Sequence, residues 1–281
     1  MVLLFALPTI AVFAAFAWWP LLRALVMSLQ RTNFIVTNWV GFDNFARVLT
    51  DPLLGQAVLN SIYFTVLAAL LGFPIPLFAA VFIAEMRRTR NLATVLVFIP
   101  VILPPVVTIL LWREFYDPGP TGLFNSILGA VGLGPVPWLQ DGLTAMPSLV
   151  LMATWAAFGQ GTIIFLAALM SIQTELYEAA EIDGASLVRR FWHITLPQLR
   201  TVILVLLLLQ IIGTLQVFTE PFLLTNGGPE NKTITVLLLI YNYAFVYGDF
   251  GAATALSLML AIALALVSAV YLALTRKWST R

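Results

Sequence analysis

Long apolar stretches separated by short polar segments dominate the pattern of hydrophobic and polar positions along the chain. Six stretches carry almost no charge, and each is close to or above the ~20 residues that an α-helix needs to cross ~30 Å of hydrocarbon. We predict spanning helices over residues 2–22, 61–84, 92–112, 148–170, 202–222 and 252–274. A seventh run, residues 233–245, is shorter and contains polar side chains, so we expect a re-entrant or interfacial helix there.

The composition agrees with this pattern. Of the 281 residues, 61% are hydrophobic and only 10% are charged, which is typical of membrane proteins. A net charge of +1 leaves no basic face for phosphates and argues against a nucleic-acid partner. The chain has no cysteine, and its only histidine, His193, has no evident second ligand, so no metal site is predicted. We predict an all-α polytopic membrane protein with one transmembrane domain over residues 1–281.

Lysine and arginine residues indicate the orientation, because cytoplasmic loops are enriched in them. One side of the predicted membrane carries nine: Arg87, Arg88, Arg90, Arg189, Arg190, Arg200, Arg276, Lys277 and Arg281. The other side carries five, spread over longer loops: Arg23, Arg31, Arg47, Arg113 and Lys232. This excess predicts that both termini and the loop after the fourth span are cytoplasmic.

The loop after the fourth span, residues 173–197, is a polar and charged segment between two of the predicted spans. Such charges cannot lie in hydrocarbon, where each costs at least a few kcal/mol, so the loop faces water. The sequence of the loop predicts a short helix that Thr174 can cap and that Gly184 ends. A second short helix is expected over residues 185–192. In it we expect two residues to point outward, Arg189 and Arg190, and two inward, Phe191 and Trp192.

The spacing in this loop resembles the EAA loop of the permease subunits of binding-protein-dependent ABC importers. Glu178-Ala-Ala is followed by Gly184 and then by Ile194-x-Leu196-Pro197. Three further segments are similar to the carbohydrate branch of that family, which includes the maltose and glycerol-phosphate permeases. They are residues 40–45, 224–229 and 241–253. The resemblance implies the type I importer fold, with six transmembrane helices and a cytoplasmic coupling loop at residues 173–197.

By the same resemblance, this loop docks on an ATPase subunit. The implied docking helix contains Glu178, Ala179, Ala180, Asp183, Gly184 and Ala185. The implied connection to the fifth span contains Ile194, Leu196 and Pro197.

The resemblance further implies a heteromeric importer in the inner membrane of a bacterial or archaeal cell. In it, a second permease subunit completes a heterodimer, two ABC ATPase subunits drive transport, and an extracytoplasmic binding protein delivers the solute. The residues agree on one point, since a P-loop requires Gly-x-x-x-x-Gly-Lys-Ser/Thr. The only lysines, Lys232 and Lys277, lie in no such run. We therefore expect a non-catalytic subunit that binds no cofactor itself, with ATP and Mg²⁺ on the ATPase.

Polar side chains in the fourth and fifth spans mark a candidate solute pathway, because polar groups inside a membrane need a cavity or a neighbour. Gln210, Thr214 and Val217 lie on one helical stripe. By resemblance, the sugar-contacting positions of the maltose permease correspond to Ala156, Ala157, Gln160, Gln210, Gly213, Thr214 and Val217. Alanine, glycine and valine replace polar or aromatic family residues there, so we expect a solute other than maltodextrin. The alternative role of each polar residue is an interhelical hydrogen bond.

We predict import of a sugar or sugar-like solute, with sugar alcohols and glycerol-phosphate derivatives left open. The alternative function is ion-coupled secondary transport of a small polar solute, which would require carboxylates at mid-membrane. The acids nearest to that position, Glu85 and Glu220, lie near the ends of spans. A membrane-embedded enzyme is a further alternative, but the spans contain no recognisable catalytic grouping.

Overall fold

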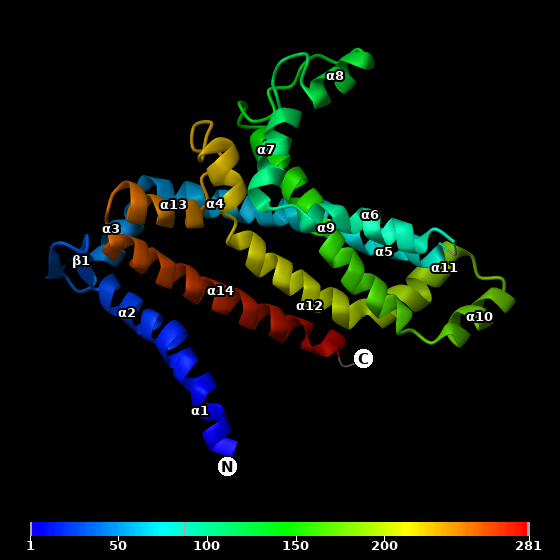
Figure 1. Cartoon of the computed structure of the whole chain (residues 1–281), viewed down its shortest axis with the longest axis horizontal. Coiled ribbons are helices and arrows are strands. Elements are labelled where there is room, and N and C mark those ends of the chain that lie inside the picture. The colour runs from blue at the N-terminus through cyan, green and yellow to red at the C-terminus, as the bar shows by residue number, and fades with distance from the viewer. Residues whose placement is uncertain (1, 87, 280–281) are drawn as a thin grey trace.

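The computed structural model describes residues 2–86 and 88–279, which form an elongated and almost entirely helical molecule (Figure 1). We label turns of π-helix η. In chain order the elements are α1 (Val2–Phe13), η1 (Ala14–Trp18), α2 (Trp19–Ser28), β1 (Gln30–Thr32), β2 (Thr37–Trp39), α3 (Asp43–Leu49), α4 (Pro52–Leu67), η2 (Ala68–Gly72), α5 (Pro74–Glu85), α6 (Arg90–Ile102), α7 (Pro105–Phe115), α8 (Leu123–Ala130), α9 (Ala145–Met170), α10 (Thr174–Ile182), α11 (Leu187–Arg190), η3 (Phe191–Thr195), α12 (Leu196–Leu215), η4 (Pro221–Thr225), α13 (Val236–Tyr241), η5 (Asn242–Val246) and α14 (Phe250–Ser279).

Helical runs of membrane-spanning length account for most of the described residues. Five are long and apolar enough to cross a membrane: Ala6–Ser28, Pro52–Glu85, Ala145–Met170, Leu187–Leu215 and Phe250–Arg276. The bent pair of α6 and α7 gives a sixth crossing when it is counted as one span. On that count, the prediction of an all-α protein with six spans is confirmed.

The third predicted span, residues 92–112, is not one straight helix. α6 and α7 meet at an angle of 96°, and the linking residues Leu103 and Pro104 have extended ψ angles of 133° and 137°. Each of them precedes a proline, and proline disfavours the helical conformation of the residue before it. The two consecutive prolines, Pro104 and Pro105, therefore break the span.

The fifth predicted span, residues 202–222, ends earlier in the structure than the sequence predicted. α12 stops at Leu215, and the chain is not helical again until residue 219, two residues before η4. The seventh apolar run forms the short helix Val236–Val246, as its length predicted. Its re-entrant or interfacial position stays a prediction.

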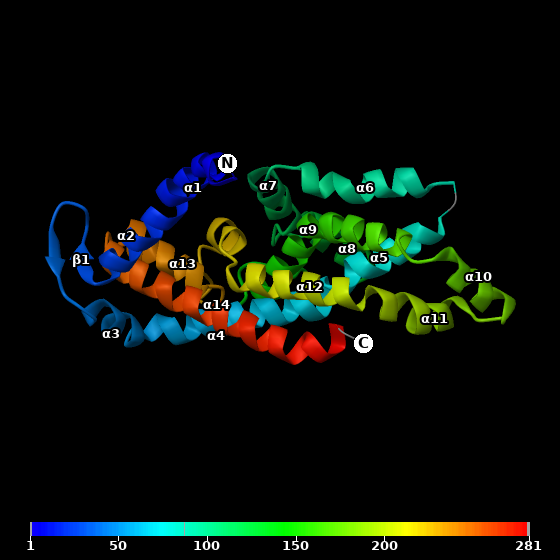
Figure 2. The same ribbon diagram turned by 90° about the horizontal axis from the view of Figure 1, so that it is seen from below.

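The two ends of the molecule differ in character (Figures 1 and 2). One end carries α10 and α11, and the facing ends of α5 and α6 share a cavity with α10; we call this the coupling end. The opposite, hairpin end carries the antiparallel strands β1 and β2 together with α3. Two of the arginines counted for orientation, Arg87 and Arg281, lie outside the described residues, as does the side chain of Lys277.

Helix α9 packs against α5, α6 and α12 in the half of the molecule that includes the coupling end, which we call the coupling half. Glycines bring these helices together. A Cβ atom on Gly159 would collide with the carbonyl oxygen of Val97 on α6, and one on Gly161 would lie 3.0 Å from Cβ of Pro76 on α5. Membrane helices associate largely through such close packing, because lipid tails provide no hydrophobic force between them.

Buried amides hold the loops of the hairpin half in place. The side-chain nitrogen of Asn60 on α4 donates to the carbonyl oxygens of Asn231 at 2.9 Å and Ile234 at 2.8 Å. The backbone N–H of Val236 donates to the hydroxyl of Ser61 at 3.1 Å. Helix α4 thus fixes the connection between η4 and α13.

An ion pair joins α3 to the start of α14 at the same end. Nη1 of Arg47 lies 2.8 Å from Oδ2 of Asp249. Burial alone would raise the pKa of Asp249, but hydrogen bonds from Arg47 and from the backbone N–H of Ala252 outweigh it and hold the pKa below its usual value. The carboxylate therefore stays charged at neutral pH and keeps the pair intact.

The packing of α9 predicts unequal effects for the same substitution at two glycines. Gly159→Ala overpacks the contact with α6 and is expected to cost about 1–3 kcal/mol. Gly55→Ala, on the open face of α4 where a Cβ meets nothing within 4 Å, is expected to be neutral or to stabilise by about 0.5–1 kcal/mol. Melting curves of the detergent-purified variants compare the two, and equal melting temperatures would contradict the close approach at Gly159.

Candidate coupling segment and solute pathway

The segment between α9 and α12 begins with α10, which stands out at the coupling end (Figure 1). None of its side chains is fully buried. Thr174, which we expected to cap the helix, is instead its first residue; Gln173 precedes it, and no side chain caps the helix. Glu175 lies in the first turn, where a negative charge complements the helix dipole.

Gly184 ends α10, as predicted. Its φ angle is +72°, a conformation that glycine adopts without the steric penalty of a side chain. The N–H groups of Gly184 and Ala185 donate to the carbonyl oxygens of Glu181 at 3.0 Å and Ala180 at 2.9 Å. These bonds satisfy carbonyl groups that a helix end otherwise leaves without partners.

The expected separate second helix is wrong, because residues 187–215 form one continuous helical run. Ser186 begins it, with its hydroxyl accepting from the N–H of Arg189 at 3.4 Å. Ile194, Leu196 and Pro197 therefore lie inside the first turns of the fifth span. The π turn η3 ends at Thr195, two residues before Pro197, which has no N–H to donate to the helix ladder.

Two of the four predicted side-chain directions near this point are also wrong. Arg189 is exposed and Phe191 packs inward, stacked on Phe78 at 5.8 Å, as expected. However, the side chain of Arg190 is only 17% exposed, whereas Trp192 is 59% exposed. Consecutive helical positions point about 100° apart, so Phe191 and Trp192 cannot both face the protein.

An exposed apolar face adjoins the candidate docking residues. Ile182 on α10 is 86% exposed, and three more apolar side chains are exposed nearby, Leu187, Val188 and Trp192. Of the candidate docking residues, four are exposed, Glu178, Ala179, Asp183 and Gly184, and two are half-buried, Ala180 and Ala185. Exposed apolar patches of this kind are typical of surfaces that contact a protein or a membrane. The sequence analysis missed Ile182, although an isoleucine in so charged a loop was a visible signal.

Gln210 on α12 and Val217, two residues beyond its end, contact the second span. Nε2 of Gln210 donates to the carbonyl oxygen of Ala68 in η2 at 2.8 Å, and the hydroxyl of Thr214 donates to the carbonyl oxygen of Gln210 at 2.8 Å. Val217 is buried beside Phe64 of α4. The interhelical hydrogen bond that we considered for Gln210 is therefore present, and its Oε1 atom has no partner among the described residues.

The other candidate pathway residues lie on surfaces that this chain does not cover. Ala157 and Gln160 on α9 and Gly213 on α12 are exposed, and Ala156 is half-buried. Within the described residues, no hydrogen-bond partner is within reach of the Gln160 side chain. A free amide on an apolar spanning helix is costly against lipid, so this surface is suited to a protein neighbour or a water-filled path. In the part of the chain that the structure describes, none of the seven candidates lines any of the three best-defined cavities.

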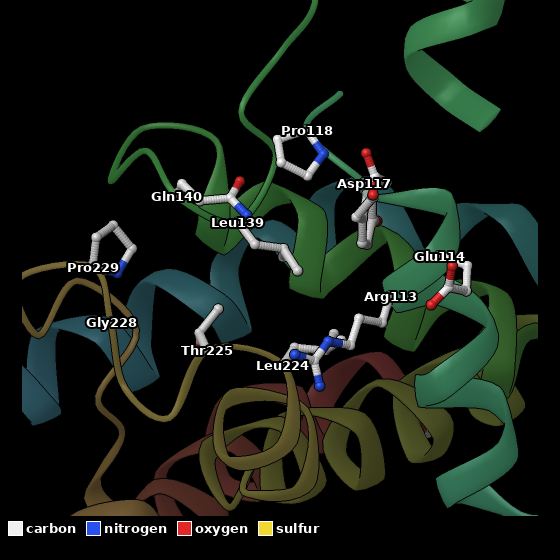
Figure 3. A pocket seen from close by; sticks show the side chains of 11 residues that line it. Arg113, Glu114, Asp117, Pro118, Leu139, Gln140, Leu224, Thr225, Gly228 and Pro229 are labelled. Carbon is white, nitrogen blue, oxygen red and sulfur yellow. The ribbon is translucent and has the colours of Figure 1, made fainter. Parts of the chain in front are cut away.

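A polar pocket of about 540 Å³ lies beyond the ends of α9 and α12 that are remote from α10 (Figure 3). Its polar lining comes from α7, the loops on either side of α8, and η4, with Arg113, Glu114, Asp117, Gln140 and Thr225. Leu139 and Leu224 also line it, and both pack against the buried cluster that contains Val217. The pocket thus borders the apolar cluster to which the candidate pathway residue Val217 belongs.

Comparisons with known proteins assign the chain to a family of transport proteins. Residues 72–280 match the family described as the binding-protein-dependent transport system inner membrane component. The chain is 32% identical to the arabinooligosaccharides transport system permease of Bacillus subtilis, over 97% of this chain and 87% of that protein. It is 34% identical to the trehalose/maltose transport system permease of Thermococcus litoralis, over 97% of this chain and 92% of that protein.

A solved structure is similar over almost the whole chain. It is a bacterial alginate ABC transporter in complex with an alginate pentasaccharide-bound periplasmic protein. The TM-score is 0.86 and the identity 28%, over 98% of this chain and 94% of that one.

The different surroundings of Gln210 and Gln160 generate a paired prediction. Gln210→Leu removes the hydrogen bond to η2 and is expected to destabilise the chain by about 0.5–1.5 kcal/mol. Gln160→Leu removes no internal bond and is expected to leave stability unchanged. Thermal unfolding of both variants in detergent measures the difference, and an equal loss in the two would contradict the structural role of Gln210.

Proposed function

Because the chain belongs to the family of binding-protein-dependent transport system inner membrane components, we propose that it is a permease subunit that forms half of the pathway of an ATP-driven sugar importer. Its part in the cycle is to convert motion of the ATPase into alternating access. The observation that carries this proposal is the exposed apolar and acidic face of α10 together with its direct continuation, after Gly184, into the fifth span.

In this proposal α10 is the docking helix for an ABC ATPase subunit. Glu178 and Asp183 offer carboxylates, and Ile182 offers a large apolar side chain to a groove on the partner. Ala179, Ala180 and Ala185 let the partner approach closely, and Gly184 sets the turn. Ile194, Leu196 and Pro197 transmit the motion, because they belong to the same continuous helix as the span.

A second permease subunit completes the pathway. The exposed side of α9 and α12, with Ala157, Gln160 and Gly213, supports this assignment, since a free amide is poorly suited to lipid. We propose that these residues face the partner permease and the solute, together with Ala156 and Thr214. The assembly includes two ATPase subunits, which hold the ATP and Mg²⁺, while this chain binds no cofactor.

The solute class follows from the relatives. Two are named for arabinooligosaccharides and for trehalose or maltose, and the similar structure for alginate. The polar pocket lined by Arg113, Gln140 and Thr225 offers the hydrogen-bonding groups that a polyhydroxylated solute requires. We propose that a sugar released by an extracytoplasmic binding protein passes this pocket before the cluster around Val217 opens.

The orientation completes the proposal. The importer lies in the inner membrane, and the coupling end and both termini face the cytoplasm, where ATP is available. The arginine excess on that side supports this arrangement. Ion-coupled secondary transport is not favoured. The two relatives reported above are named as transport system permease proteins, and the similar structure is an ABC transporter.

Affinity purification of the tagged chain from its native membrane tests the proposal. We expect a second permease and a P-loop ATPase to co-purify, identified by mass spectrometry. Gly184→Val should reduce the recovered ATPase several-fold, because it strains the turn that presents α10. A chain recovered alone from mild detergent would overturn the proposed function.

Gly248→Val is the matched control for this experiment. Gly248 has a φ angle of +67°, and a Cβ atom at this position, like one on Gly184, would meet nothing within 4 Å. Gly248 precedes α14 at the hairpin end, so its replacement introduces similar backbone strain without touching the coupling segment. We expect its ATPase recovery to match the unmodified chain, and equal losses in both variants would assign the effect to general destabilisation.

A further inference from the structure

We propose that Tyr177 and Arg190 fasten α10 to the first turns of the fifth span, so that the coupling helix and this span move as one body. The inference rests on the proposed function, because it concerns how motion at α10 reaches the membrane. It assigns positioning roles to side chains that neither the motif nor the apolar pattern identifies.

The first observation is that little else holds α10. None of its side chains is fully buried, and a cavity of about 550 Å³ separates it from the ends of α5, α6 and α9. A helix that is separated from the body in this way cannot transmit a displacement through an apolar core. Its mechanical connection therefore depends on the chain itself and on individual side-chain links.

The first link is a hydrogen bond between hydroxyl groups. Oη of Tyr177 lies 3.0 Å from Oγ1 of Thr195 in η3. Tyr177 is half-buried, and Thr195 is only 4% exposed. The Thr195 end of the bond is thus shielded from water, so a water molecule cannot easily take the place of the Tyr177 hydroxyl there.

The second link is an ion pair across the Gly184 turn. Nη1 of Arg190 lies 3.6 Å from Oε2 of Glu181, and Glu181 is 75% exposed. Such a pair adds little to stability, so its value lies in position. Nε of Arg190 is buried and has no hydrogen-bond partner among the described residues, which leaves Glu181 as the anion that holds this guanidinium.

The π turn aligns the two links. Tyr177 and Glu181 are four residues apart on α10 and share one face. Their partners Arg190 and Thr195 are five residues apart, and in a regular α-helix such positions point about 140° away from each other. The i→i+5 bonding of a π turn brings residues five apart toward one side. η3 occupies residues 191–195, which is where this alignment is needed.

A displacement of α10 would then reach the second span as well. The continuous helix from Leu187 carries it to Gln210, whose side chain is bonded to the carbonyl oxygen of Ala68 in η2. The two links, the π turn and the Gln210 bond form one route from the docking surface to the middle of the bundle.

Distances between spin labels test whether α10 and the fifth span move together. The chain has no cysteine, so labels can be placed at Glu175→Cys on α10 and Val205→Cys on α12, both exposed positions. The complete importer, with cysteine-free partner subunits, is measured in lipid nanodiscs without nucleotide and after trapping with ATP and vanadate. We expect one unchanged, narrow distance distribution in both states.

Tyr177→Phe combined with Arg190→Gln removes both links and should broaden and shift that distribution on trapping. Thr195→Val provides a milder second variant that removes the hydroxyl link alone and should give a smaller change. The exchange Glu181→Arg with Arg190→Glu, made with Tyr177 unchanged, keeps an ion pair with reversed charges. It should retain most of the narrow distribution of the unmodified complex.

Tyr271→Phe is the matched control. Its hydroxyl, on α14, donates to the carbonyl oxygen of Leu204 on α12 at 2.8 Å, so the variant removes a tyrosine hydroxyl bond to the same span at a site remote from α10. We expect the wild-type distribution to be retained.

Two results would overturn the inference while leaving the proposed function intact. The first is a label distance that changes between the two states in the unmodified complex. The second is a double variant with the same distance distributions as the unmodified complex. In each case the ATPase must still be bound. Absence of the ATPase from the purified, unmodified complex would instead contradict the proposed function.

Discussion

Hydrocarbon provides no hydrogen-bonding partners, so a chain that crosses it must satisfy its backbone groups within its own helices. This constraint accounts for the helical runs of this protein and also for the surroundings of its irregular points. In η2 the carbonyl oxygen of Ala68 accepts from the N–H of Phe73 at 2.9 Å and from Gln210 at 2.8 Å. The break between α6 and α7 is followed by buried side chains, including Ile109 and Trp112, that pack with Met152 of α9. At η2, the side chain of another span thus contributes to satisfying the irregular backbone.

The two halves of the molecule are held by different forces. In the coupling half, glycines such as Gly159 let α9 approach its neighbours at van der Waals distance, and no polar network is required. In the hairpin half, buried amides such as Asn60 bond the loops to α4. A rigid, closely packed bundle joined to hydrogen-bonded loops suits a subunit whose spans must move as units. The polar pocket lies where these two regions meet, above the apolar cluster around Val217.

The coupling segment combines exposure with attachment. Ile182 and other side chains of this segment are exposed, while Arg190 and Thr195 are turned toward the protein. The docking role that we propose requires both properties, because a surface that binds a partner transmits no motion unless it is fixed to the spans. The π turn before Pro197 lies where the backbone lacks the N–H of the proline. The same turn aligns the two links.

The sequence by itself determined the features that depend on local composition. The six apolar stretches, the end of α10 at Gly184 and the family resemblance of residues 173–197 could all be read from it, because length, charge and glycine act within a few residues. The tertiary structure alone decided where Arg190 and Trp192 point, that Gln210 bonds to Ala68, and that the second short helix is part of the fifth span. These features depend on neighbours distant in sequence or on the register of a π turn, and a one-residue change in register turns a side chain by about 100°. The 96° break lies between the two cases, since Pro104 and Pro105 were visible but only packing around α7 fixed its direction.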